Sequence, residues 1–155
     1  MIQTQMIIES WNLTVKRVSD LIAKVSDEEI MREVAPNRNR GIYLLGHLTA
    51  SHDSMLPLLG FREPMFPELR DPFLKNADNL DEQSFTVAVL LQKWTVVNDE
   101  LKKHFNDLSI EDWLQKHTAI SDEDFAKEPN RNRLNVVLSR TNHLSYHQGQ
   151  LALLQ

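Results

Sequence analysis

The feature that most constrains the fold is a proline-bearing segment, residues 60–81, between two long helical patterns. Antiparallel helices that are neighbours need only a few connecting residues, whereas this segment is long enough to return along a helix of ~30 Å. It therefore predicts a crossover that makes the two flanking helices parallel. The alternative is a floppy surface loop, but Met65, Phe66 and Phe73 favour a segment that packs against the protein.

Apolar residues recur at helical spacing along most of the chain, and long strand-like alternation is missing. Ser26 with Glu29 matches a capping box and predicts a short helix over 27–33, and the sequence "SIED" at 109–112 caps another. The fold class is therefore all-α. The long helices are predicted at residues 2–25, 40–59, 83–105 and 133–155.

The chain repeats the five-residue sequence PNRNR at 36–40 and 129–133. Each half consists of a long helix, a capped short helix, PNRNR and a second long helix, with about ten extra residues near 116–125 in the second half. Two copies of one helical hairpin predict pseudo-two-fold symmetry. Alternatively, PNRNR reflects shared local needs, in which Asn39 or Asn132 caps the next helix and the arginines pair with carboxylates.

Composition restricts the compartment and the chemistry. A length of 155 residues suits a single domain, 1–155, and the net charge of −5 disfavours a nucleic-acid binder. With no cysteine, any metal must be bound by histidines and carboxylates. The N-terminus lacks the pattern of a signal peptide, and no apolar run approaches the 18 residues of a membrane span. We therefore expect a cytoplasmic protein with no membrane association.

Histidines provide the candidate metal ligands. His143 and His147 are four residues apart, which places them on one helical face with Cβ atoms about 6 Å apart. The residue after the first of them is Leu144, so the general base of the zincin motif is absent. The third candidate is His47, because helices packed 8–10 Å apart can bring a mid-helix histidine onto the same ion. Three neutral histidines leave a coordination position free, as in catalytic metal sites.

The other histidines are expected outside this cluster. His52 lies five residues after His47, about 140° around the helix. His104 falls at a helix end and His117 in a loop, so both are expected to be surface residues. Tyr146 is expected to pack against the first helix or a partner subunit, and the tryptophans are expected in the core or at a dimer contact.

Arg140 lies one helical turn before His143 on the same face. It is also the counterpart of His47 in the repeat, since each follows the proline of its PNRNR by eleven residues. One interpretation is a clamp for a substrate carboxylate near the metal. The other, which we favour from the sequence, is a partly buried arginine that pairs with an acidic side chain such as Asp53 or Asp99.

The crossover, His47 and the run formed by His143, His147, Gly149 and Gln150 resemble the DinB/YfiT-like superfamily of metal-dependent enzymes over essentially the whole chain. The resemblance implies a four-helix bundle of up-down-down-up order with a long crossover between helices 2 and 3. It further implies a divalent metal ion (zinc, nickel or iron) bound by His47, His143 and His147, and a homodimer.

The same resemblance implies a function: a low-molecular-weight-thiol S-transferase or a hydrolase that acts on small electrophiles. A thiol or water at an open metal position becomes the nucleophile, which requires no protein cysteine. No general acid or base is identified from the sequence. The competing hypothesis is a catalytically silent dimeric stress or binding protein with a structural or vestigial histidine cluster.

Overall fold

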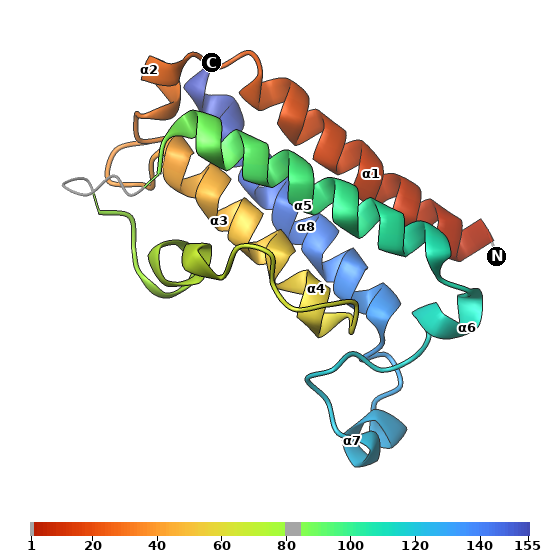
Figure 1. Ribbon diagram of the computed structural model, residues 1–155. Helices are drawn as coiled ribbons and strands as arrows, with labels where there is room; N and C mark the ends of the chain where they lie inside the picture. The colour runs from red at the N-terminus through yellow and green to blue at the C-terminus, as the bar shows by residue number, and fades with distance from the viewer. Residues whose placement is uncertain (1, 80–84) are drawn as a thin grey trace.

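The computed structural model describes residues 2–79 and 85–155, and these residues are all-helical apart from loops and isolated bridges (Figure 1). The all-α prediction is confirmed for this part of the chain. The long helices are α1 (Ile2–Ile22), α3 (Gly41–Asp53), α5 (Val87–Asp107) and α8 (Arg133–Leu151). The short helices are α2 (Asp27–Ile30), α4 (Met55–Leu58), α6 (Ile110–Trp113) and α7 (Asp122–Lys127). Two short 3-10 helices are η1 (Pro67–Leu69) and η3 (Ala152–Leu154), and η2 (Asp71–Lys75) is a short π-helix.

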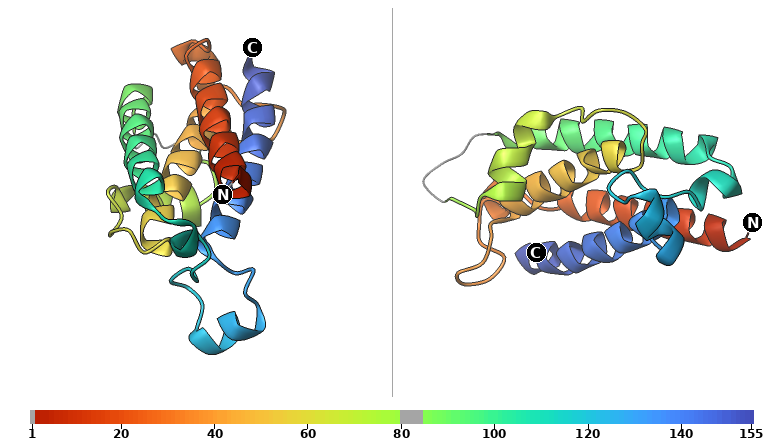
Figure 2. Two further views of the ribbon diagram at one scale, coloured as in Figure 1. Left: turned by 90° about the vertical axis from the view of Figure 1, so that its right-hand side faces the viewer. Right: turned by 90° about the horizontal axis from the view of Figure 1, so that it is seen from below.

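The four long helices lie side by side (Figures 1 and 2). Helix α1 packs along α8, α3 packs along α5, and α3 also contacts α8. Helices α3 and α5 start at the same end of the molecule and run in the same direction, while α1 and α8 run the opposite way (Figure 1). This is the parallel arrangement that the length of the crossover predicts. Among the described helices, none combines the length and apolarity that crossing a bilayer requires.

The helix ends differ from the predictions by a few residues. The first long helix stops at Ile22, and the second is interrupted at Ser54, where α3 ends and α4 begins. Helix α5 starts at Val87 because the Thr86 side chain accepts a hydrogen bond from the backbone of Val89. Its predicted start at residue 83 lies outside the described residues.

The two halves of the chain adopt the same local structure around PNRNR. Helices α2 and α6 both begin with capping boxes. After each of them the chain forms an antiparallel bridge beside PNRNR, Glu33 with Arg40 and Lys116 with Asn132. The predicted asparagine cap exists only in the second copy, where Asn132 caps α8, whereas Arg40 is the N-cap of α3. The extra residues of the second half contribute to α7, which sequence analysis did not predict.

The crossover packs against α3, so it is not a floppy loop. At its start, both oxygens of the Asp53 carboxylate accept backbone hydrogen bonds, from Met65 N at 2.8 Å and Phe66 N at 2.9 Å. Leu69 and Phe73 are buried in the core, and Met65 and Phe66 are half-buried. Met65, Phe66 and Phe73 therefore pack against the rest of the protein, as the sequence predicted.

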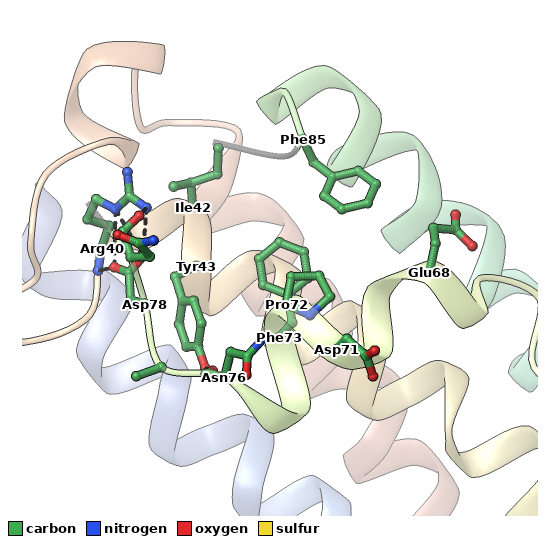
Figure 3. Close-up of a pocket in the computed structure, with 12 residues that line it drawn as sticks. Arg40, Ile42, Tyr43, Glu68, Asp71, Pro72, Phe73, Asn76, Asp78 and Phe85 are labelled. Carbon is green, nitrogen blue, oxygen red and sulfur yellow. Dashed lines mark hydrogen bonds and ion pairs between the residues drawn. The ribbon is translucent and has the colours of Figure 1, made fainter. Parts of the chain in front are cut away.

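The end of the crossover is fixed to the first turn of α3 (Figure 3). Arg40 Nη2 lies 2.6 Å from Asp78 Oδ1, and both side chains are almost completely buried. Tyr43 donates its hydroxyl hydrogen to the carbonyl of Asn76 at 2.7 Å. A pocket of about 410 Å³ lies between these contacts and Phe73. Because both ends of the crossover are tied to α3, its middle is held against the same helix.

Gly46 permits the closest approach of the crossover to α3. A Cβ atom at this position would lie 2.3 Å from the ring of Phe73, far inside van der Waals contact. Any larger residue would push the η2 turn away from the helix. The absence of a side chain at position 46 therefore sets the distance between α3 and the segment that contains Phe73.

We expect Gly46→Ala to destabilise the protein by about 1–3 kcal/mol, the usual cost of overpacking a core. The matched control is Gly149→Ala in α8, where the new Cβ would meet no atom within 4 Å. That change should stabilise the protein by about 0.5–1 kcal/mol, because alanine is the better helix former. Urea unfolding measures both. Equal free energies of unfolding for the two variants would contradict the close approach.

Candidate metal centre

Three histidines from two helices meet between α3 and α8. His143 Nε2 lies 3.0 Å from His47 Nε2 and 3.1 Å from His147 Nε2. One ligand atom from each residue can be chosen so that all lie within 4.8 Å of one another. Nitrogen ligands at 2.0–2.1 Å from a tetrahedral ion are separated by about 3.4 Å. The two Nε2 distances that involve His143 are therefore close to those that a single divalent ion requires.

The local sequence explains how each imidazole is presented. The four-residue spacing stacks His143 and His147 on one face of α8. Leu144 and Leu151, which flank His147 at −3 and +4, are fully buried and turn this face toward the core. His47 lies in the middle of α3, and Gly46 beside it lets the crossover reach the same place.

Hydrogen bonds at Nδ1 orient two of the rings. His47 Nδ1 lies 2.9 Å from the carbonyl oxygen of Phe73, which can only accept, so this nitrogen is the donor. His147 Nδ1 lies 2.6 Å from Gln150 Oε1, and Gln150 Nε2 donates to the Tyr146 hydroxyl, which fixes the amide orientation. In a neutral ring with its proton on Nδ1, Nε2 presents a lone pair. Both rings therefore direct lone pairs at His143 Nε2.

Burial disfavours the protonated forms of His143 and His147. Desolvation lowers the pKa of His143 to about 4, with further lowering from His147, His47 and Arg140. Desolvation also lowers the pKa of His147, against an opposing effect of its hydrogen bond to Gln150. A single proton on His143 Nε2 could be donated to only one of its two neighbours. A divalent cation would satisfy all three lone pairs at once, so this donor set fits such an ion.

The third ring lacks the support that the other two have. His143 Nδ1 is buried and has no hydrogen-bond partner among the described residues. Metal-bound histidines usually donate this N–H to an oxygen acceptor. The centre is thus held firmly at His47 and His147 and less firmly at His143.

His52 lies outside the cluster, as expected from its position on α3, and it is completely buried. Its ring packs between Trp11, at a centroid distance of 4.5 Å, and Trp94, at 4.8 Å. Its Nδ1 lies 2.8 Å from Asn98 Oδ1, while Nε2 is buried without a partner. Desolvation lowers the pKa of His52 to about 3, so it is a neutral core residue. The tryptophans belong to this core, each at most 2% exposed.

The expectation for His104 and His117 was wrong in part, because both are half-buried rather than on the surface. His104 stacks on Phe61 at a centroid distance of 4.5 Å and its Nε2 lies 3.2 Å from Glu100. Desolvation lowers the pKa of His117, with a smaller contribution from the charge of Arg131.

The favoured interpretation of Arg140 was also wrong. Arg140 is half-buried, yet within residues 2–79 and 85–155 it forms no ion pair or hydrogen bond. Asp53 is occupied by the crossover backbone, and Asp99 is exposed on α5. Desolvation lowers the pKa of Arg140. The remaining interpretation is an arginine that is available to an anion.

Tyr146, which was expected to pack against the first helix or a partner subunit, is largely exposed in the single chain, and a contact with a partner stays a prediction. It is 65% exposed, and its ring centroid lies 5.1 Å from that of His147. Sequence analysis also missed the acceptors of the histidine N–H groups. Gln150 follows His147 by three residues, a spacing that could have identified it. The Phe73 carbonyl is a backbone atom of a distant segment, and no residue pattern identifies it.

The sequence and the fold have relatives. The family model described as the DinB superfamily matches residues 6–151. The crystal structure of a conserved protein from Enterococcus faecalis has a TM-score of 0.68, at 17% sequence identity, over 97% of this chain and 94% of that chain. At this identity the similarity shows the fold alone. No curated protein matches the sequence significantly.

We expect the purified, untagged protein to bind close to one divalent ion per chain. His47→Ala, His143→Ala and His147→Ala should each abolish stoichiometric binding, because two imidazoles cannot complete the site. Gln150→Ala should weaken affinity by about 10–100-fold through loss of ring orientation. Metal analysis and chelator competition measure these values. His104→Ala is the control, since it removes an imidazole elsewhere; equal losses in this variant would contradict the assignment.

The buried His52 predicts acid sensitivity of the metal-free protein. The pKa of His52 is about 3 in the folded protein, against 6.5 for an ordinary histidine. At a pH between these two values, His52 is protonated in the unfolded chain but not in the folded protein. Stability should therefore fall as the pH drops below about 6.5, by up to about 1.4 kcal/mol per pH unit for this group. Urea unfolding between pH 7 and 4.5 measures this slope. His52→Gln should lower it by up to about 1.4 kcal/mol per pH unit, which corresponds to one proton. An unchanged slope would contradict it.

Proposed function

Since this chain belongs to the DinB superfamily, we propose that it is a metal-dependent enzyme acting on small electrophiles. The observation that supports this most directly is the convergence of His47, His143 and His147 Nε2 atoms on one point. His47 and His143 are half-buried rather than fully enclosed, which supports a site near the surface. A closed structural site would need a fourth protein ligand, and the described metal-ligating group contains three.

The chemistry is divided between a bound ion and the chain. A divalent ion supplies Lewis acidity, which acidifies a thiol or water and polarises an electrophile. The three imidazoles bind the ion through Nε2, and the Phe73 carbonyl and Gln150 fix the rings of His47 and His147. We propose either transfer of a low-molecular-weight thiol or hydrolysis, since both use a nucleophile that the protein itself does not contribute.

Several further features belong to the same proposal. The metal is zinc, nickel or iron, and the protein is a cytoplasmic homodimer. The chain is one domain, 1–155, and its architecture is a four-helix bundle of up-down-down-up order formed by α1, α3, α5 and α8. The directions of these helices in Figure 1 support that order. The short helices are additions at the ends of this bundle.

The test is turnover that depends on the metal. Metal-loaded protein is incubated with a panel of small thiols and 1-chloro-2,4-dinitrobenzene, and separately with activated esters. We expect a rate at least about 100-fold above that of chelator-treated protein, because the Lewis acid supplies several kcal/mol of transition-state stabilisation. The rate should disappear in His47→Ala and persist in His104→Ala.

The competing hypothesis makes a different prediction for the same samples. A catalytically silent stress or binding protein would retain the ion in stoichiometric amount, yet the loaded and chelator-treated protein would react at equal rates across the whole panel. That result would contradict the proposed enzymatic function while leaving the metal centre intact.

A further inference from the structure

A second cavity lies beside the metal centre at the N-terminal half of α8. Its volume is about 260 Å³, and its polar lining is formed by His117, Arg131, Asn132, Asn135, Ser139 and Arg140. Among the described residues that line it, none is acidic. In a chain of net charge −5, a cavity lined by two arginines and no carboxylate is unusual. Its lining is complementary to an anion.

Arg140 is the residue of this cavity that most needs a ligand. Arg140 is half-buried and, in the described part of the chain, its guanidinium has neither an ion-pair partner nor a hydrogen-bond acceptor. A partly desolvated cation without a partner costs free energy, so proteins usually compensate it. Arg40, in the other half of the repeat, shows the compensated case through its buried pair with Asp78.

His117 and Arg131, which line the same cavity, also offer hydrogen-bond donors. The backbone N–H of Ala119 donates to His117 Nδ1 at 3.2 Å, so a neutral His117 has its proton on Nε2. Arg131 lies 3.8 Å from Glu128, a long and exposed contact that leaves most of its donors available. Asn132 uses its side-chain oxygen to cap α8. The arginines and the imidazole thus supply donors rather than acceptors.

The cavity and the histidine cluster both use side chains of α8. Arg140 precedes His143 by one turn on the same face, and its charge contributes to the lowered pKa of His143. The lining on α8 is centred near Val136, seven residues from His143, which at 1.5 Å per residue is about 10 Å along the axis. A molecule that reaches both places must therefore be about 10 Å long.

We propose that this cationic cavity binds a carboxylate or phosphate group of a small-molecule substrate, with Arg140 as the principal contact. The substrate class is thus an anionic small molecule whose charged group lies within about 10 Å of its reactive end. The position of the reactive end rests on the proposed function, whereas the binding of the anion does not. Arg140 is a substrate-binding residue in this scheme.

The test is anion binding to metal-free protein, so that the ion itself cannot be the binding partner. Succinate, inorganic phosphate and uncharged succinamide are titrated at constant ionic strength, with calorimetry and the His117 imidazole NMR signal as readouts. We expect succinate or phosphate to bind and to shift that signal, and succinamide to do neither. Tighter binding of succinate would identify a carboxylate ligand, and tighter binding of phosphate a phosphoryl ligand.

Arg140→Gln should weaken anion affinity by about 10–100-fold, because it removes a charged pair of donors. Arg140→Lys should lose less, since it keeps the charge but not the planar fork. The matched control is Arg17→Gln on α1, which changes the net charge equally at an exposed position and should leave affinity unchanged. Far-ultraviolet circular dichroism verifies that each variant is folded.

Two results would overturn the inference: equal affinity in Arg140→Gln and Arg17→Gln, or no anion binding to folded wild-type protein. Metal uptake is measured on the same samples and separates the two proposals. Arg140→Gln should retain the ion of the wild type. Suppose that wild-type protein binds anions but no metal, and that Arg140→Gln binds anions more weakly. The anion cavity would then stand and the proposed function would fail.

Discussion

The close contact between the crossover and α3 at Gly46 is the constraint on which the site depends. With no Cβ at position 46, the ring of Phe73 lies directly on the helix, and its carbonyl oxygen reaches His47 Nδ1. Asp53 fixes the crossover at one end and the Arg40–Asp78 pair fixes it at the other. A long connection, which would otherwise be the most variable part of such a fold, therefore orients a candidate metal ligand.

The clustered histidines then define what the space between α3 and α8 can bind. His47 and His147 each donate from Nδ1 to an oxygen acceptor, so their Nε2 lone pairs meet at His143. Desolvation opposes protonation of His143 and His147, and the rings cannot relieve one another by hydrogen bonding alone. Nitrogen lone pairs that face one another favour a positive charge between them. A divalent ion can interact with all three imidazoles at once, whereas a proton is bound by one nitrogen at a time.

The repeated halves of the chain have diverged in how they use positive charge. The local structure around PNRNR is alike, with capped short helices and matching bridges. In the first half Arg40 is neutralised by Asp78, and the equivalent of Arg140 is the candidate ligand His47. In the second half Arg131 and Arg140 line a cavity without carboxylates. The first half thus contributes one candidate ligand and a neutralised arginine, while the second contributes two candidate ligands and leaves cationic groups available.

The sequence by itself determined the features that depend on local spacing. Helical periodicity gave the all-α class, the length of segment 60–81 gave parallel α3 and α5, and the i, i+4 spacing together with a mid-helix position identified His143, His147 and His47. Tertiary structure decided the rest, because it depends on atoms distant in sequence. Three features arise from packing between separate segments: the Phe73 carbonyl at His47, the burial of His52 between two tryptophans, and the lack of a partner for Arg140 among the residues that the structure describes. Spacing along one helix cannot reveal which neighbour occupies the space beside it.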